Sequence, residues 1–213
     1  FGWTVTAVQP APTVPVTNPW IPADLKALLA SRANPTADFT LSNKRFMSLD
    51  NRTWDENFDV SQVLIGASGK LPIKDWKWDV YASHDSTRLT ETANNVVMVS
   101  HLEQLIDDPR GGETYCAGGF NPFGLAQSAQ ISAACKAYLT VNAVNTYNVS
   151  QDIFEGSITG ALLTLPADDV RFSLSASHRE NRSEYIPDAL YVFNDGLGTA
   201  PSQKTTGKTA VSE

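Results

Sequence analysis

The two cysteines carry the most definite chemistry in this chain. Cys116 and Cys135 are its only cysteines, and 19 positions separate them. No histidine lies near them at the spacing of zinc ligands, so a zinc site is poorly supported. Two interpretations remain open. The pair forms a disulfide that closes a loop, which fits an oxidising compartment, or it is two unpaired thiols.

Other patterns with catalytic or ligand-binding chemistry are incomplete. The three histidines are scattered and show no metal-binding motif. Residues 66–70 (GASGK) lack the first glycine of a P-loop and the Ser or Thr that follows its lysine. Asp55, Glu56 and Asp59 do not have the spacing of a calcium-binding loop and favour a solvated face. We therefore expect no catalytic residues, no metal, no cofactor and no enzymatic activity.

Residues 153–179 show the clearest structural pattern. Phe154, Ile158 and Leu162 fall on one side of the first half, and polar residues fall on the other. The second half alternates in the same way after Asp169, so we predict two amphipathic strands joined by the turn 165–169. Each has about ten residues of alternation, the length at which a tilted strand crosses a bilayer. A strand of a soluble β-sandwich would alternate equally.

A second hairpin is predicted from residues 60–83. Its arms, 60–71 and 76–83, alternate around a tight turn at 72–75. Trp76 and Trp78 follow the turn directly, on the apolar face. That is the position of the aromatic girdle in a membrane barrel, but core residues of a sandwich would give the same pattern.

Long connections separate these hairpins and carry short helical patterns. Residues 1–7 alternate as a strand, and a proline-rich loop follows. We predict helices over 25–32, 95–106 and 132–139, with Asp24 as the N-cap or a first-turn residue of the first. The connections 9–37 and 84–150 are long, whereas the hairpin turns are short. Alternating short and long connections are typical of outer-membrane barrels.

Composition excludes some classes of protein. The chain has 213 residues, 42% of them hydrophobic, and a net charge of -7. The negative charge argues against a general nucleic-acid binder. No run approaches the roughly eighteen apolar residues of a membrane helix, and no basic, apolar leader opens the sequence. We expect a mature or internal segment.

Five stretches together resemble the barrel of TonB-dependent outer-membrane receptors. They occur in the family's order and span nearly the whole chain. Asp168-Asp169 departs from the Gly-Pro that the family usually has in its turn. The stretches are NPWIPADL at 18–25, the hairpin from VLIGASGKL at 63–71 to WKW at 76–78, the C…NPFG…S…Y pattern within 116–139, the hairpin 160–179, and GKTAVSE at 207–213.

The resemblance implies an all-β fold, an antiparallel transmembrane β-barrel segment with long extracellular loops that carry short helices. Residues 1–213 would form part of the barrel domain, with no counterpart of the plug domain or TonB box. The implied function is uptake of an iron chelate, cobalamin or a glycan across the outer membrane of a Gram-negative bacterium. The implied partners are outer-membrane lipid, the plug, TonB through the plug, and the substrate.

The same resemblance assigns directions to side chains in the two hairpins. Residues expected to face lipid are Val80, Ile158, Leu162, Phe172 and Leu174. Residues expected to face the lumen or plug are Lys77, Asp79, Tyr81, Glu155, Ser157, Arg171 and Ser173, and each could simply solvate the interior. The alternative function is a soluble secreted β-sandwich that binds a ligand. In the sandwich, Phe172 and Leu174 would lie in a packed core.

Overall fold

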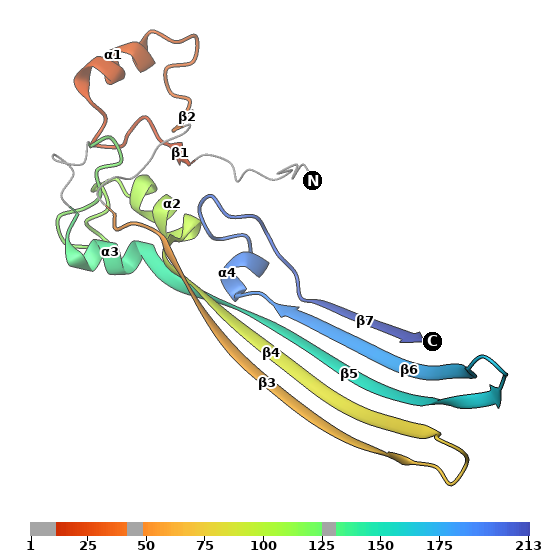
Figure 1. Cartoon of the computed structure of the whole chain (residues 1–213). Coiled ribbons are helices and arrows are strands. Elements are labelled where there is room, and N and C mark those ends of the chain that lie inside the picture. Colours follow the sequence, from red (N-terminus) through yellow and green to blue (C-terminus); the bar gives the residue numbers. More distant parts are fainter. Residues whose placement is uncertain (1–11, 42–48, 125–130) are drawn as a thin grey trace. The chain divides into compact units, whose positions relative to one another are not determined.

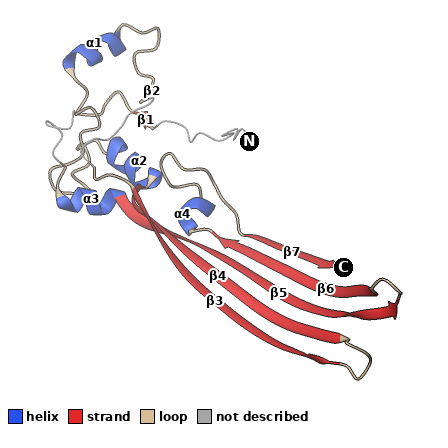
Figure 2. Cartoon of the chain, in the orientation of Figure 1, coloured by secondary structure: helices blue, strands red, loops and turns tan. Residues whose placement is uncertain are grey.

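The computed structural model describes residues 12–41, 49–124 and 131–213, so the strand predicted at residues 1–7 lies outside the described part. The described residues form mostly antiparallel β structure with four short helices (Figures 1 and 2). The chain divides into two compact units. We call residues 56–91, 145–186 and 204–213 the sheet unit, and the remainder the helical unit.

The principal sheet has five strands in the order β3-β4-β5-β6-β7 (Figure 1). Sequence order and spatial order agree, because each strand pairs with the next one along the chain. Among the described residues the sheet is open, with β3 and β7 at its edges. The strands are β3 (Thr53–Lys70), β4 (Lys77–Val97), β5 (Thr140–Thr164), β6 (Asp169–Ile186) and β7 (Thr205–Ser212).

Two tight turns join the strands where the sequence predicts them. Between β3 and β4, Leu71 N donates to Trp76 O at 2.9 Å, and Lys74 adopts a φ of 47°. Between β5 and β6, Leu165 N donates to Asp168 O at 3.1 Å. The register then pairs Ile158 with Leu174 and Thr159 with Ser173. Both predicted hairpins are therefore confirmed, with their alternating faces in phase.

The connection predicted over residues 84–150 is wrong at both of its ends. β4 continues to Val97 and β5 already begins at Thr140, so only residues 98–139 connect them. Residues 84–97 and 140–152 have no sustained apolar-polar alternation, which is why they look like a loop. Their strand conformation comes from backbone pairing with neighbouring strands, and their content of Thr and Val suits it.

The helical unit contains α1 (Ala23–Ala30), α2 (Val99–Asp107), α3 (Ala133–Leu139) and α4 (Ala189–Val192), together with the two-stranded sheet of β1 (Thr13–Val14) and β2 (Phe39–Thr40). Its main core is an apolar cluster built around one face of α2. Other members come from β1, α3 and the disulfide. The buried residues of this cluster are Val14, Val97, Leu102, Leu105, Ile106, Cys116, Phe120, Cys135 and Leu139.

The predicted helices are found with shifted bounds. α3 agrees closely with the prediction, and α1 begins and ends two residues early, with Asp24 in its first turn and Pro22 as N-cap. α2 begins at Val99 rather than near residue 95, because residues 95–97 still belong to β4. It ends at Asp107, before Pro109, as predicted.

Candidate functional site

The seven residues expected to face a barrel lumen share one face of the sheet unit. Register pairs Ser157 with Ser175 and Ala161 with Arg171, so these side chains point to the same side as Glu155. Tyr81 donates its hydroxyl to Glu155 at 2.8 Å, which brings the odd-numbered residues of β4 to this side as well. We call this surface the polar face. It carries Lys77, Asp79, Tyr81, Glu155, Ser157, Arg171 and Ser173.

A shallow, open hollow of about 400 Å³ lies on β3, β4 and β5 near their turn ends. Its lining combines charges and hydroxyls and includes no histidine or cysteine. Such groups can solvate an interior or hydrogen-bond a neighbouring surface. The lining residues are Ser68, Gly69, Lys70, Lys77, Trp78, Asp79, Ser157 and Thr159.

Arg171 differs from the other six because it is tied to the first hairpin turn. Its guanidinium lies 2.6 Å from the carboxylate of Asp75. Asp75 also accepts a hydrogen bond from Ala161 N at 2.7 Å, beside the irregularity in register between Ala161 and Leu163. Arg171 therefore braces the turn. Asp75 and Arg171 are 96 positions apart in sequence, so local spacing could not reveal this pair.

Within the sheet unit, none of the described residues covers the opposite face, which we call the apolar face. Ile65, Phe154 and Leu174 are exposed by 73%, 58% and 67%. A Cβ atom on Gly156 would lie 3.4 Å from Val80, so β4 presents its even-numbered residues on this face. The apolar residues of this face on the described strands include Val63, Ile65, Ala67, Trp78, Val80, Ala82, Phe154, Ile158, Val170, Phe172, Leu174 and Ala176.

An aromatic cluster marks the turn end of the apolar face. The ring of Trp76 lies edge-on to Phe172, with centroids 4.7 Å apart, and its indole N–H donates to Ala161 O at 2.9 Å. Gly160 makes room for this arrangement, because a Cβ there would lie only 2.4 Å from the Trp76 ring. Trp76 is therefore held in place at the edge of the apolar surface.

Charged residues replace the apolar ones at one level on neighbouring strands. His84 Nδ1 lies 2.6 Å from Asp152 on the adjacent strand, and Asp152 is opposite Glu180 in the register. Glu180 in turn pairs with Arg182 and, at 3.0 Å, with Lys208. The apolar face therefore ends at the level where β4, β5, β6 and β7 carry charged side chains in ionic contacts instead.

Past this level, the polar face presents an aromatic pair. Tyr147 and Tyr185 are opposite each other in the register and stack with ring centroids 4.6 Å apart and an interplanar angle of 26°. Our sequence analysis missed both, because Tyr147 lies in the segment predicted as a long connection and Tyr185 lies past the predicted strand pair 153–179. The signal was present, since Tyr147, Val149 and Gln151 alternate in phase with Glu155.

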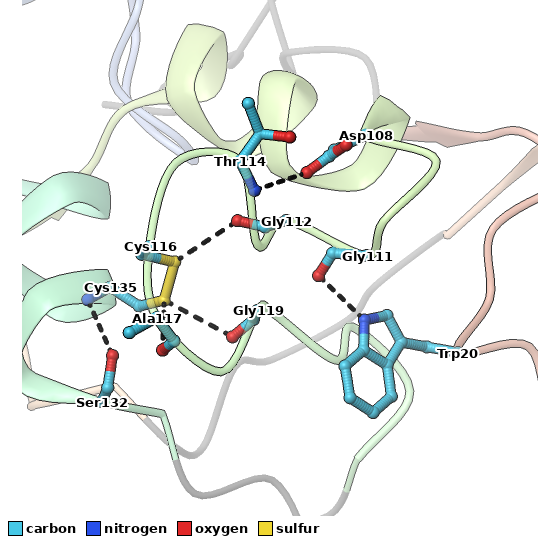
Figure 3. Close-up of a disulfide and its surroundings, with 10 residues drawn as sticks. All are labelled: Trp20, Asp108, Gly111, Gly112, Thr114, Cys116, Ala117, Gly119, Ser132 and Cys135. Atoms are coloured by element: carbon cyan, nitrogen blue, oxygen red, sulfur yellow. Dashed lines mark hydrogen bonds between the residues drawn. A yellow bond between two sulfur atoms is a disulfide. The ribbon is translucent and has the colours of Figure 1, made fainter.

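The cysteines form the disulfide Cys116–Cys135, with Cα atoms 5.0 Å apart (Figure 3). Both are buried in the main core of the helical unit. Ser132 caps α3, because its side chain accepts a hydrogen bond from Cys135 N at 3.2 Å. Trp20 donates its indole N–H to Gly111 O at 2.9 Å, which ties the proline-rich segment to the loop that precedes the disulfide (Figure 3).

Asp108 organises the loop that precedes the disulfide. Its carboxylate accepts hydrogen bonds from Thr114 N at 2.9 Å and from Arg110 N at 3.1 Å. Burial of the carboxyl opposes ionisation, but these bonds and the Arg110 charge outweigh it and lower the pKa of Asp108. The ionised form of Asp108 is thus the one that holds the loop.

The described residues contain no group of three or more His, Cys, Asp or Glu side chains that could hold a metal ion. In the same part of the chain, no helix has the length and apolar character to cross a membrane. No protein-family model and no curated protein matches this chain. The two faces of the sheet unit, and the levels at which their character changes, are therefore the main indications of function.

Proposed function

We propose that this chain is part of the transmembrane β-barrel of a TonB-dependent receptor in the outer membrane of a Gram-negative bacterium. The observation that carries the proposal is the exposed apolar face of the sheet unit, which has a definite end on each side along the strands. It has aromatic residues at its turn end, a charged row at its other end and, on β4, β5 and β6, a polar face behind it. Transmembrane barrels combine an apolar band, aromatic girdles and a polar interior in this way.

The height of the apolar face fits a bilayer. On β4 it runs from Trp76 to Ala82, six residue steps or about 20 Å along the strand at about 3.3 Å per step. On β3 it runs from Val63 to Leu71, eight steps or about 26 Å. With a strand tilt of about 40°, these lengths span about 15–20 Å of membrane, which is more than half of the expected band of about 25 Å. The strands continue well past that band.

Strand order agrees with the same proposal. Adjacent antiparallel strands follow one another in the chain, and short turns alternate with the longer connections 98–139 and 187–204. An open sheet in lipid would leave backbone groups unpaired at both edges, so further strands must close it. Assignment to the receptor family rests on the ordered resemblance of the five sequence stretches. Uptake of an iron chelate, cobalamin or glycan, with a plug and TonB as partners, follows from that assignment.

The competing β-sandwich needs a second layer over the apolar face. Leu174, which the sandwich would bury, is exposed by 67%, and Ile65 is exposed by 73%. Among the described residues, the two apolar core clusters are built from the helical unit alone. An uncovered apolar surface of this extent is costly in water and favours lipid as the covering medium.

The proposal is tested by the environments of neighbouring side chains on β6. Single cysteines replace Leu174, Ser173 or Arg182 in the protein that the natural gene encodes, and each carries a fluorescent probe. Cys116 and Cys135 stay unlabelled because they are bonded to each other. Lipid-borne and water-soluble quenchers are then compared in vesicles.

We expect lipid quenching at position 174 and quenching only from water at 173 and 182. Residue 182 is the matched control, since it lies on the same face as 174 but within the charged row. Protection from both quenchers at 174 would indicate a packed protein core. That result would refute the receptor proposal and favour the soluble β-sandwich.

A further inference from the structure

We propose that the polar face past the charged row binds a neutral glycan, through the stacked pair Tyr147 and Tyr185 and the amides of Gln151 and Asn181. This inference rests on the proposed function, because it names the substrate class of the same barrel. The site is formed by β5, β6 and β7, and we call it the tyrosine wall. It comprises Tyr147, Val149, Gln151, Ile153, Arg179, Asn181, Ser183, Tyr185, Thr205, Gly207, Thr209 and Val211.

The polar face changes character along its strands. Near the turns it carries charged groups such as Lys77, Asp79 and Glu155. On the tyrosine wall, Arg179 is the one charged residue, and Asp85 of the neighbouring strand β4 lies on the same face with the opposite charge. A purely solvating interior would have no need of aromatic rings at this level, where side chains are no longer opposite lipid. The change therefore points to a ligand that is itself uncharged.

The chemistry of the tyrosine wall matches a sugar surface. Tyr147 and Tyr185 are half-buried and supply rigid aromatic surface with a polar tip. Gln151 donates to Asn181 at 2.7 Å, and Asn181 donates to Thr209 at 3.4 Å, which aligns amides and a hydroxyl across three strands. Each amide retains further donor and acceptor capacity for hydroxyl groups. A pyranose ring offers C–H groups to an aromatic surface and hydroxyls to amides.

Small residues lie on the tyrosine wall beside the two tyrosines. Gly207 is opposite Ser183 in the register, and a Cβ atom at position 207 would lie 2.9 Å from the Ser183 hydroxyl. With Gly and Ser at this level, the strip next to Tyr185 is free of bulky side chains. A flat ring can therefore approach the backbone there.

Charge distinguishes a glycan from an anionic iron chelate. An anionic chelate loses its hydration when it enters a binding site, so Lys or Arg groups in the site must pair with its negative charge. The tyrosine wall supplies Arg179 alone, and the chain as a whole has a net charge of -7. The wall therefore offers little electrostatic attraction to an anionic ligand, whereas a neutral ligand needs none.

The test measures binding to the natural full-length protein in detergent by isothermal titration calorimetry. The probes are neutral hexasaccharides, namely maltohexaose, cellohexaose and xylohexaose, together with ferric citrate as an anionic chelate. Variants are Tyr147→Ala, Tyr185→Ala and the ring-retaining Tyr147→Phe and Tyr185→Phe. Ser150→Ala is the matched control, because it lies at the same level of β5 on the opposite face.

We expect one hexasaccharide to bind, with affinity lowered about tenfold or more by either alanine variant. The phenylalanine variants should stay within about threefold of wild type, and Ser150→Ala should be unchanged. Normal binding in the alanine variants would overturn the proposal, as would binding of ferric citrate with no binding of any hexasaccharide. In the second case the receptor function survives. A protein that does not insert into membranes at all would overturn both.

Discussion

Leu174→Arg tests the assignment of the apolar face to lipid more sharply than any other single substitution. Leu174 lies between Phe172 and Ala176, in the run of apolar positions from Val170 to Ala176 that this face has on β6 before His178. Ser173 is its neighbour on the same strand and points to the polar face opposite Thr159. The two positions therefore differ in face but share strand and depth.

The expected magnitude follows from that depth. An arginine at the midplane of a barrel's lipid face costs about 2–4 kcal/mol, and the cost falls to about 0–1 kcal/mol near the interfaces. Leu174 is near the middle of the apolar face, so we expect the full midplane cost, or a folding equilibrium about 30-fold to 900-fold weaker. Ser173→Arg should change the folding free energy by less than about 1 kcal/mol.

The assay is reversible folding of the full-length protein from guanidinium into phospholipid vesicles, followed by tryptophan emission. Equal losses for Leu174→Arg and Ser173→Arg would refute the assignment of faces. Folding of the wild type to the same state without vesicles would refute the lipid-facing interpretation altogether. A larger loss for Ser173→Arg would mean that the two faces are exchanged.

Three further predictions concern single contacts. Removing the disulfide by Cys116→Ala should destabilise the helical unit by about 3 kcal/mol, because a loop of about 20 residues is freed in the unfolded chain. Cys135→Ala and the double variant should lose as much protection from hydrogen exchange over residues 102–120 as Cys116→Ala does. If the losses of the two single variants added up in the double variant, loop closure by the disulfide would not explain the stabilisation. Asp108 has a lowered pKa in the folded state, so its stabilising effect is complete above the unfolded pKa of about 3.9 and is lost as pH falls through the folded pKa. The difference in melting temperature between wild type and Asp108→Asn should therefore vanish at low pH, and a difference that grows on acidification would show the opposite sign of shift. Gly160→Ala should displace Trp76, since its Cβ would lie 2.4 Å from the ring, and shift tryptophan emission to the red, whereas Gly156→Ala, with its nearest contact at 3.4 Å, should not. Identical spectra for the two variants would mean that Gly160 does not position the indole.

Much of the local structure could be predicted from the sequence. Alternation over 153–179 and 60–83 predicts two hairpins, both turns and the division of side chains between faces, because strand periodicity is a property of consecutive residues. The seven residues expected on one face do share it. The spacing of apolar residues over 132–139 likewise predicts α3, and Pro109 predicts the end of α2.

Features that join distant segments required the tertiary structure. The bond between Cys116 and Cys135 was one of two possibilities, and the Asp75–Arg171 ion pair leaves no trace in local spacing. The outer halves of β4 and β5 lack sustained alternation, so pairing with neighbouring strands identifies them as strands. Because the four registers of the five-stranded sheet must be combined before residues at one level are known, the charged row and the tyrosine wall became visible only in the folded sheet.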